Sequence, residues 1–255
     1  MAIEKTQSLV LKQSKLRETS LIVTHFTRDF GKLKTVCKGV RQERSSLFLN
    51  FQPFVHLDII FYKKEKSELH LLKESSCIED FQWIREDFTS WSLASFFVDF
   101  VEEIMPLEEP HAEVFELLLD ALRGLKIEHS ISLLRSFEIK LLSLSGLWPH
   151  LDHCVVCQKS ESEDFQFSPA QGGLVCSSAL CLKRASDHRV LSKGSVATLR
   201  FISAHSFNEA VKLSISGSIA KELEHLIRDF VIFHVGRELK SARFLGEVRD
   251  VLKIH

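Results

Sequence analysis

The chain has 255 residues, of which 45% are hydrophobic and 26% charged, and its formal net charge is −1. This length and hydrophobic content suffice for one large domain or two to three small domains with buried cores. Charges interrupt every apolar stretch, which excludes a membrane-spanning helix. The start MAIEKTQSLVLKQ has charges at Glu4 and Lys5 and no apolar h-region, so we do not expect a signal peptide. We therefore expect a cytoplasmic protein.

The charge is unevenly distributed along the chain. Residues 1–80 carry 14 Lys and Arg against 10 Asp and Glu, residues 81–150 carry 5 against 12, and residues 151–255 carry 14 against 12. The N-terminal segment is thus basic and the middle segment acidic. This distribution favours residues 1–80 for a polyanion-binding surface.

The first 80 residues predict a small β-barrel. Short runs rich in β-branched and aromatic residues are separated by polar or Gly/Pro punctuation. The expected strands are Ser8–Gln13, Ser20–Thr27, Lys32–Lys38, Phe54–Tyr62 and Glu68–Glu74. In the fourth, Val55, Leu57, Ile59 and Phe61 share one face, as a half-buried strand requires. Five such strands are typical of an OB-fold, and OB-folds commonly bind nucleic acid on one face.

Cations concentrate in this segment. Between Lys5 and Arg44 there are ten basic residues against three acidic ones, a balance of +7. Such a surface can neutralise phosphates and release their counterions, although a solvated face of ordinary lysines has the same composition. The candidate nucleic-acid contacts are Lys12, Lys32 and Lys34 on strands and Lys38, Arg41 and Arg44 in the loop after the third strand. The phenylalanines of this segment fit either the core or a base-stacking platform.

After Asp80 the apolar spacing becomes helical. The expected helices are Trp83–Ile104, Ala112–Leu125, Ser130–Ser145, Lys193–Ser203, Phe207–Leu213, Ser218–Val235 and Lys240–Lys253. The predicted fold is therefore α+β, with an N-terminal five-stranded OB-fold barrel (residues 1–80), an all-α domain (residues 81–149 and 185–255) and a zinc-finger-like insertion (residues 150–184), which we call the cysteine excursion.

Four of the six cysteines define that excursion. Cys154 and Cys157 form a C-x2-C pair, and Cys176 and Cys181 form a looser C-x4-C pair. Two such pairs can close a tetrahedral shell around Zn2+, and a complete thiolate shell leaves no position for an activated water. A structural, non-catalytic zinc site is thus predicted. Disulfides would need an oxidising compartment. Loss of the metal, with the cysteines kept as small buried side chains, is a further alternative.

The ligand set is less certain than the site. His150, His153 and His188 lie close enough in sequence to replace one thiolate, so the fourth ligand is either Cys181 or a nearby histidine. Cys37 and Cys77 are single cysteines in the barrel segment, and we expect both to be small buried side chains.

Motifs of enzymes are missing from the sequence. It has no phosphate loop, dinucleotide fingerprint, H-E-x-x-H or nucleophile elbow. Glu102, Glu103, Glu108 and Glu109 cluster near a predicted helix end, where acids more often face solvent than act in catalysis. We expect no enzyme and no organic cofactor.

Several separate motifs run through the chain in a fixed order. They are R-E-T-S-L-I-V (Arg17–Val23), F-T-R-D-F-G-K-L (Phe26–Leu33), K-G-V-R (Lys38–Arg41), F-Q-P-F (Phe51–Phe54), G-G-L-V-C (Gly172–Cys176) and L-K-S-A-R-F-L (Leu239–Leu245). Together they resemble the bacterial RecO family of DNA repair proteins over nearly the whole chain. Cys181 departs from this pattern, because it stands two residues later than a second C-x2-C would place it.

The resemblance implies a recombination mediator located in the cytoplasm at the nucleoid. Such proteins bind single- and double-stranded DNA, anneal complementary strands without ATP and act with RecR to load the strand-exchange recombinase. They also engage single-stranded DNA-binding protein through its acidic C-terminal tail, for which the resemblance implies a groove on the helical domain. An adaptor whose helical surface binds partners, with incidental DNA affinity, is the alternative. A nuclease is disfavoured because the acidic residues show no spacing suited to Mg2+.

Overall fold

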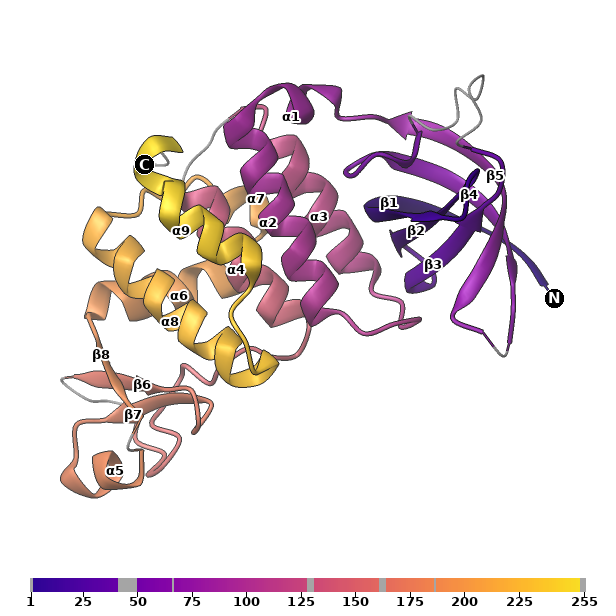
Figure 1. Ribbon diagram of the computed structural model, residues 1–255. Helices are drawn as coiled ribbons and strands as arrows, with labels where there is room; N and C mark the ends of the chain where they lie inside the picture. The colour runs from indigo at the N-terminus through magenta and orange to yellow at the C-terminus, as the bar shows by residue number, and fades with distance from the viewer. Residues whose placement is uncertain are drawn as a thin grey trace. The chain divides into compact units, whose positions relative to one another are not determined.

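The computed structural model describes residues 2–40, 50–65, 67–127, 131–160, 164–185 and 187–252, the last six without their side chains. The chain divides into two compact units, Met1–Ile127 and Glu128–His255 (Figure 1). The predicted α+β class is confirmed: a closed five-stranded barrel is followed by helices and a four-cysteine insertion.

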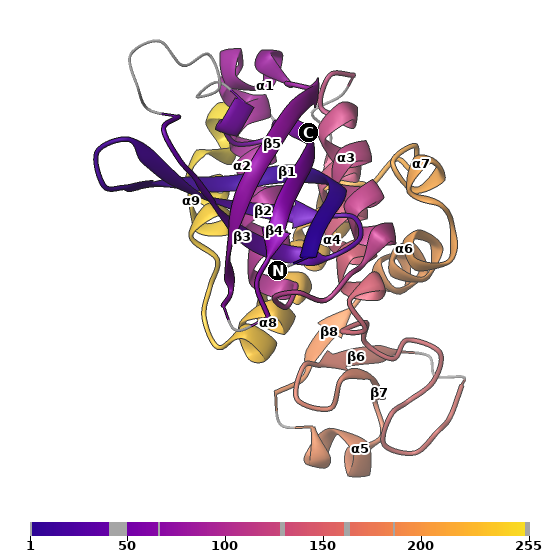
Figure 2. The same cartoon turned by 90° about the vertical axis from the view of Figure 1, so that its right-hand side faces the viewer.

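The first unit contains the barrel and three helices. Its elements are β1 (Ala2–Leu16), β2 (Ser20–Thr27), β3 (Gly31–Cys37), β4 (His56–Lys63), β5 (Leu69–Glu79), α1 (Gln82–Glu86), α2 (Phe88–Ile104) and α3 (Ala112–Gly124). The barrel faces the viewer in Figure 2, and its strand order is β1-β2-β3-β5-β4. All neighbouring strands run antiparallel except β3 and β5, which pair in parallel.

Apolar side chains at alternate positions of the strands fill the interior of the barrel. Leu57, Ile59 and Phe61 of β4 are fully buried, as the sequence predicts, and belong to one core cluster with Val23 of β2 and Leu33 of β3. The predicted strand four began at Phe54, but β4 begins at His56, because Phe54 has a left-handed φ of 76° that breaks the extended chain. The inward positions of each strand thus supply one continuous apolar core.

β1 closes the barrel by pairing on both of its edges. Its first half pairs with β4, from Ala2 opposite Lys63 to Leu9 opposite His56. Its second half pairs with β2 and reaches Leu16 opposite Ser20. The register shifts between Val10 and Lys12, and this irregularity allows one long strand to bend from one partner to the other.

The helices of the first unit differ from the prediction at one point. The expected single helix Trp83–Ile104 is two helices, because Asp87 is extended and its carboxylate accepts a 2.7 Å hydrogen bond from the Ser90 backbone N–H, which starts α2. Phe115 of α3 packs on Phe26 of β2, with ring centroids 6.5 Å apart. Aromatic contacts of this kind attach the helices to the outside of the barrel.

The second unit combines helices with the cysteine excursion. Its elements are α4 (Ile131–Leu144), β6 (Phe165–Ser168), β7 (Gly173–Cys176), α5 (Ala179–Arg184), β8 (Arg189–Leu191), α6 (Lys193–Ala204), α7 (Phe207–Ala210), α8 (Gly217–Val235) and α9 (Lys240–Leu252). Helix α4 contacts α6, α7 and α8, and Ser130, where the sequence predicts this helix to begin, lies outside the described residues.

A three-stranded sheet of order β7-β6-β8 joins the cysteines to the helices of this unit. Phe167 of β6 contacts Phe230 of α8, with ring centroids 5.8 Å apart, and Arg189 of β8 forms an ion pair with Asp229. The sequence did not predict these short strands. They anchor the excursion to α8 through one buried aromatic contact and one surface ion pair.

Candidate metal centre and nucleic-acid interface

The first cysteine pair lies on a tight turn. The backbone N–H of Cys154 donates to the carbonyl of Lys159 over 2.9 Å, and the N–H of Gln158 donates back to the carbonyl of Cys154 over 2.8 Å. Gln158 has a left-handed φ of 63°, which lets the chain reverse. The turn therefore directs the side chains of Cys154 and Cys157 toward one point.

The second pair comes from the neighbouring hairpin and helix. Cys176 ends β7 and Cys181 lies in α5. Gly173, at the start of β7, lies against the backbone of His150, where a Cβ atom would collide with the carbonyl oxygen. This close approach holds the segment before Cys154 next to β7, so that both pairs meet.

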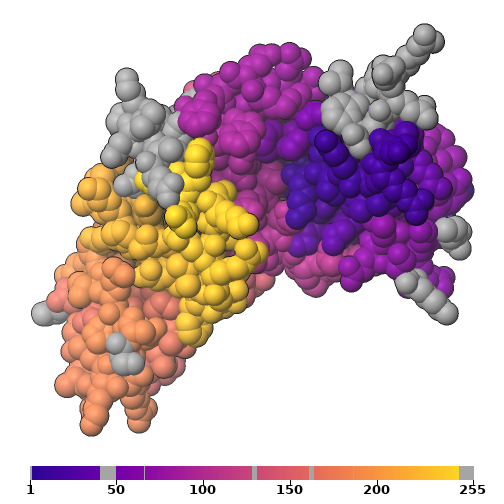
Figure 3. All heavy atoms as spheres, in the orientation of Figure 1, coloured from indigo at the N-terminus to yellow at the C-terminus, as the bar shows by residue number. Residues whose placement is uncertain are grey.

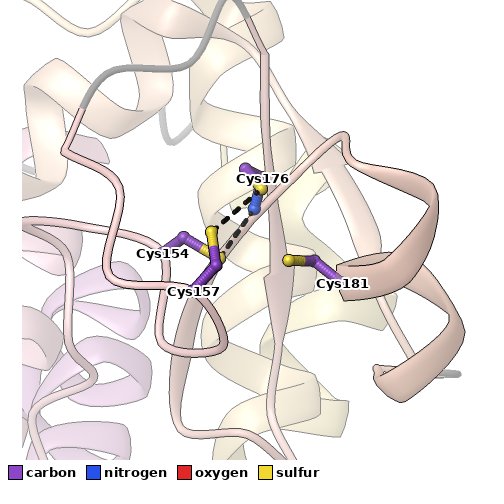
Figure 4. A group of neighbouring side chains, drawn as sticks. All are labelled: Cys154, Cys157, Cys176 and Cys181. Carbon is purple, nitrogen blue, oxygen red and sulfur yellow. Dashed lines mark hydrogen bonds between the residues drawn. The ribbon is translucent and has the colours of Figure 1, made fainter.

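All four sulfur atoms lie within 4.8 Å of one another (Figure 4). The Sγ atoms of Cys157 and Cys176 are 3.6 Å apart, and the backbone N–H of Cys176 donates to the Sγ of Cys154 over 3.3 Å. A tetrahedral Zn2+ with Zn–S bonds of about 2.3 Å separates its sulfurs by about 3.8 Å. The cluster therefore has the donors and the dimensions that a four-coordinate metal requires.

The electrostatics of the cluster also favour a cation. Burial raises the pKa of Cys154, but hydrogen bonds from the N–H groups of Cys176, Cys157 and Val156 outweigh it and lower the pKa to about 6. Burial and the neighbouring thiols raise the pKa of Cys181 to about 12. Without a metal the four sulfurs cannot all be ionised, whereas a bound cation compensates their charge.

The histidines considered as alternative ligands have other contacts. His150 Nε2 and His153 Nδ1 are 2.8 Å apart and hydrogen-bond to each other, and His188 Nδ1 is bonded to the carbonyl of Ala185. Among the described residues the metal-ligating cluster consists of the four cysteines alone. The geometry thus brings Cys181, and none of these histidines, to the other three thiols.

On the barrel, two of the candidate lysines contact α2. Lys12 forms an ion pair with the carboxylate of Glu102, and the ammonium group of Lys32 donates to the backbone carbonyl of the same residue. Burial lowers the pKa of Lys32, against the raising effect of Glu102 and Glu103. The acidic end of α2 therefore already partners two of the cations that the sequence assigned to DNA.

The other candidates have different surroundings. Lys34 is half-buried on β3, and Lys38 is exposed just after that strand. Arg41 and Arg44 lie outside the described residues. In Figure 3 the indigo residues of β1 to β3 form part of the surface of the first unit. The assignment of these four residues to DNA contact stays a prediction.

Two family models match the chain. One, described as the N-terminal part of recombination protein O, matches residues 1–81, and the other, described as its C-terminal part, matches residues 85–243. A protein of Syntrophus aciditrophicus named DNA repair protein RecO is 34% identical over 253 residues, which is 97% of each chain. The chain belongs to the DNA repair protein RecO family.

Further RecO proteins are similar to this chain over nearly its whole length. Those of Desulfatibacillum aliphaticivorans and Caldanaerobacter subterraneus are 30% and 29% identical, covering 96% and 98% of this chain. This RecO chain is therefore a DNA repair and recombination protein, and all four cysteines lie inside the part that the C-terminal RecO model matches. No helix within the described part of this RecO chain has the length and apolarity needed to cross a bilayer.

Sequence reasoning missed two features of this RecO barrel. It assigned Lys12 and Lys32 to DNA without finding Glu102, because partners so distant in the chain leave no local signal. It also predicted Cys77 to be buried. Cys37 is buried, but Cys77 is exposed, so that part of the prediction is wrong. Cys77 lies near the end of β5, beyond the part that pairs with β3.

Proposed function

We propose that this RecO chain is a recombination mediator that binds single- and double-stranded DNA through its barrel, anneals complementary strands without ATP and helps to load the strand-exchange recombinase. The observation that carries the proposal is the surplus of cations on the barrel segment, with Lys38 exposed beside β3. Annealing requires two polyanions to be held close together, and a cationic surface lowers their mutual repulsion. No step of this activity needs a catalytic residue.

We further propose that Cys154, Cys157, Cys176 and Cys181 bind one structural Zn2+. The metal would supply charge compensation and a cross-link between the turn, β7 and α5, and no reaction chemistry, because four thiolates fill its coordination shell. The sulfur separations and the N–H donors to Cys154 support this assignment.

RecR and the acidic tail of single-stranded DNA-binding protein are the proposed protein partners. A groove for an acidic tail needs a cationic rim, and the candidates in the last 65 residues are Arg200, Arg228, Arg237, Lys240 and Arg243. Arg200 donates two hydrogen bonds to the carbonyl of Leu151. Arg200 therefore has a structural role, and the other four residues remain candidates for the rim.

A salt titration tests the DNA-binding proposal. For single strands the logarithm of affinity falls with the logarithm of salt concentration by about 0.7 per neutralised phosphate. Replacing Lys38, Arg41 and Arg44 together by alanine should flatten this slope by roughly 2 and slow annealing in parallel. Zinc content and the circular dichroism spectrum should not change. An unchanged slope would exclude this loop, and DNA binding that is weak and insensitive to salt in the unmodified protein would favour the adaptor function.

A further inference from the structure

An aliphatic row crosses the outside of the barrel. Leu21, Val23, Leu33 and Cys37 point into the core, so the residues between them on β2 and β3 face outward. The strand registers place Ser14 of β1 opposite Ile22 of β2, Ile22 opposite Val36 of β3, and Val36 opposite Leu71 of β5. Ile22, Val36 and Leu71 are half-buried, so part of each side chain is open to solvent.

Cations flank this row. Lys34 and Lys38 stand two positions on either side of Val36, on the same outward face of the chain, and their Cα atoms are about 13 Å apart along an extended strand. Lys12 stands two positions from Ser14 on β1, but its ammonium group pairs with Glu102 of α2. The outward positions of the described parts of β1 to β3 that surround the row include no Asp or Glu. They are Lys12, Ser14, Leu16, Ser20, Ile22, Thr24, Lys34, Val36 and Lys38. The positive charge of this outward face is therefore complementary to a polyanion.

The same positions also include no aromatic side chain. Among the described barrel aromatics, Phe26, Phe51, Phe54 and Phe61 are buried, and Phe30 packs on Phe61 beneath the ammonium group of Lys63. Tyr62 of β4 is half-buried and stands opposite Leu71, at the β5 end of the row. Proteins that bind single-stranded DNA without sequence preference stack bases on aromatic rings, and each stacked base increases affinity on the order of tenfold or more. From β1 to β3 the described outward positions of the row therefore offer bases aliphatic contact without a ring.

We propose that this outward face (Ser14, Ile22 and Val36, flanked by Lys34 and Lys38) is the single-strand track of the protein, and that it holds DNA by its phosphates while leaving the bases unstacked and free to pair. The inference rests on the proposed annealing function. A base stacked on a ring must leave it before a complementary strand can pair with it. An aliphatic floor excludes water under the strand without that barrier, so weak contact with the bases favours annealing.

Installing a ring on the track tests the proposal. Val36→Tyr and, independently, Ile22→Tyr place an aromatic side chain at an outward position where a strand tolerates it. Each variant should bind a single strand about 5- to 150-fold more tightly, the range that one stacked base contributes, and should anneal complementary oligonucleotides several-fold more slowly. A single strand carrying 2-aminopurine should remain bright on the unmodified protein and be quenched on both variants.

Ile60→Tyr is the matched control. Ile60 is also β-branched, half-buried and outward, but it lies on β4 between Lys5 and Glu74, off the proposed track. The Ile60→Tyr variant should bind and anneal DNA as the unmodified protein does. Circular dichroism and thermal melting verify that each variant folds, and the two track variants give independent readings.

The outcomes separate the two proposals. An unmodified protein that neither binds nor anneals DNA contradicts the proposed function itself. If it binds and anneals, but both folded tyrosine variants on the track match Ile60→Tyr, the strand runs elsewhere and this inference is wrong. Strong 2-aminopurine quenching by the unmodified protein also overturns it, because the bases would then already be stacked.

Discussion

Among the described residues, the barrel core is a cluster of eleven buried residues from its strands and from the segment between β3 and β4. The core around the cysteines has five described residues, of which three are cysteines. Every barrel strand has two paired neighbours, but the sheet of the excursion has strands of three or four residues. A small segment with so little apolar surface to bury needs a cross-link to be ordered. In this molecule apolar burial orders one region, and we expect a metal to order the other.

Removing the metal should have the largest effect and should act on one region only. Structural zinc binding in zinc-finger peptides corresponds to about 10–16 kcal/mol, so Cys154→Ser should lose the metal and the order of residues 150–184. Metal analysis should find about one zinc per chain before the change, and hydrogen exchange should rise in the excursion while the barrel stays protected. Cys77→Ser, which alters an exposed cysteine outside the cluster, should change neither measurement. Loss of hydrogen-exchange protection in the barrel of Cys154→Ser would show that the order of the two regions does not have separate origins.

Acid should weaken the barrel through its buried histidines. His25 is fully buried between the hydroxyls of Ser8 and Thr35, and burial lowers its pKa from 6.5 to about 3. Below pH 6.5 the unfolded chain binds a proton that the folded barrel does not, so the free energy of unfolding falls as pH falls toward 3. Above pH 6.5 this histidine contributes no pH dependence. The slope from His25 approaches about 1.4 kcal/mol per pH unit.

Amide exchange of β2, followed from pH 7 to pH 5, measures this slope for the barrel alone. Burial also lowers the pKa of His56 and of His70, so His25→Gln should reduce the slope without abolishing it. His225→Gln changes an exposed histidine of α8 and should leave this pH slope unchanged. An equal slope in both variants would show that His25 is protonated in the folded barrel or that the barrel opens locally.

The smallest effect concerns the contact of Lys12 with α2. Glu102→Gln removes the charge that pairs with Lys12 and should cost less than about 1 kcal/mol, because the lysine is largely exposed. If the freed ammonium group then reaches a phosphate, the salt slope of single-strand binding should steepen by about 0.7. Glu113→Gln removes an exposed carboxylate from α3 and serves as the control. An unchanged slope in Glu102→Gln would place Lys12 away from the DNA.

The sequence predicted the features that depend on local pattern. Period-two alternation found all five barrel strands, and helical spacing found most helices. Cysteine spacing located the four thiols that the structure brings together. β1 was predicted as Ser8–Gln13 but runs from Ala2 to Leu16, because its ends alternate polar and apolar residues only weakly and are held by two partner strands.

What could not be predicted depends on distant partners. The ion pair of Lys12 with Glu102 joins residues far apart in sequence, and the strands β6 to β8 are too short to carry a periodic signal. The break at Asp87 did leave a signal, an N-cap residue before Phe88, but the apolar stripe continues across it because Ile84 of α1 is buried as well. Periodicity reports burial, and burial alone does not distinguish one helix from two.

The double pairing of β1 has a consequence for synthesis on the ribosome. β1 is made first, yet its N-terminal half has no partner until β4 follows, and β5 must emerge before the sheet closes. At roughly 5–20 residues per second, several seconds pass during which a long strand presents an open edge. Nascent chains of this protein should therefore be most prone to mispairing, and most dependent on chaperones, before residue 79 has left the exit tunnel.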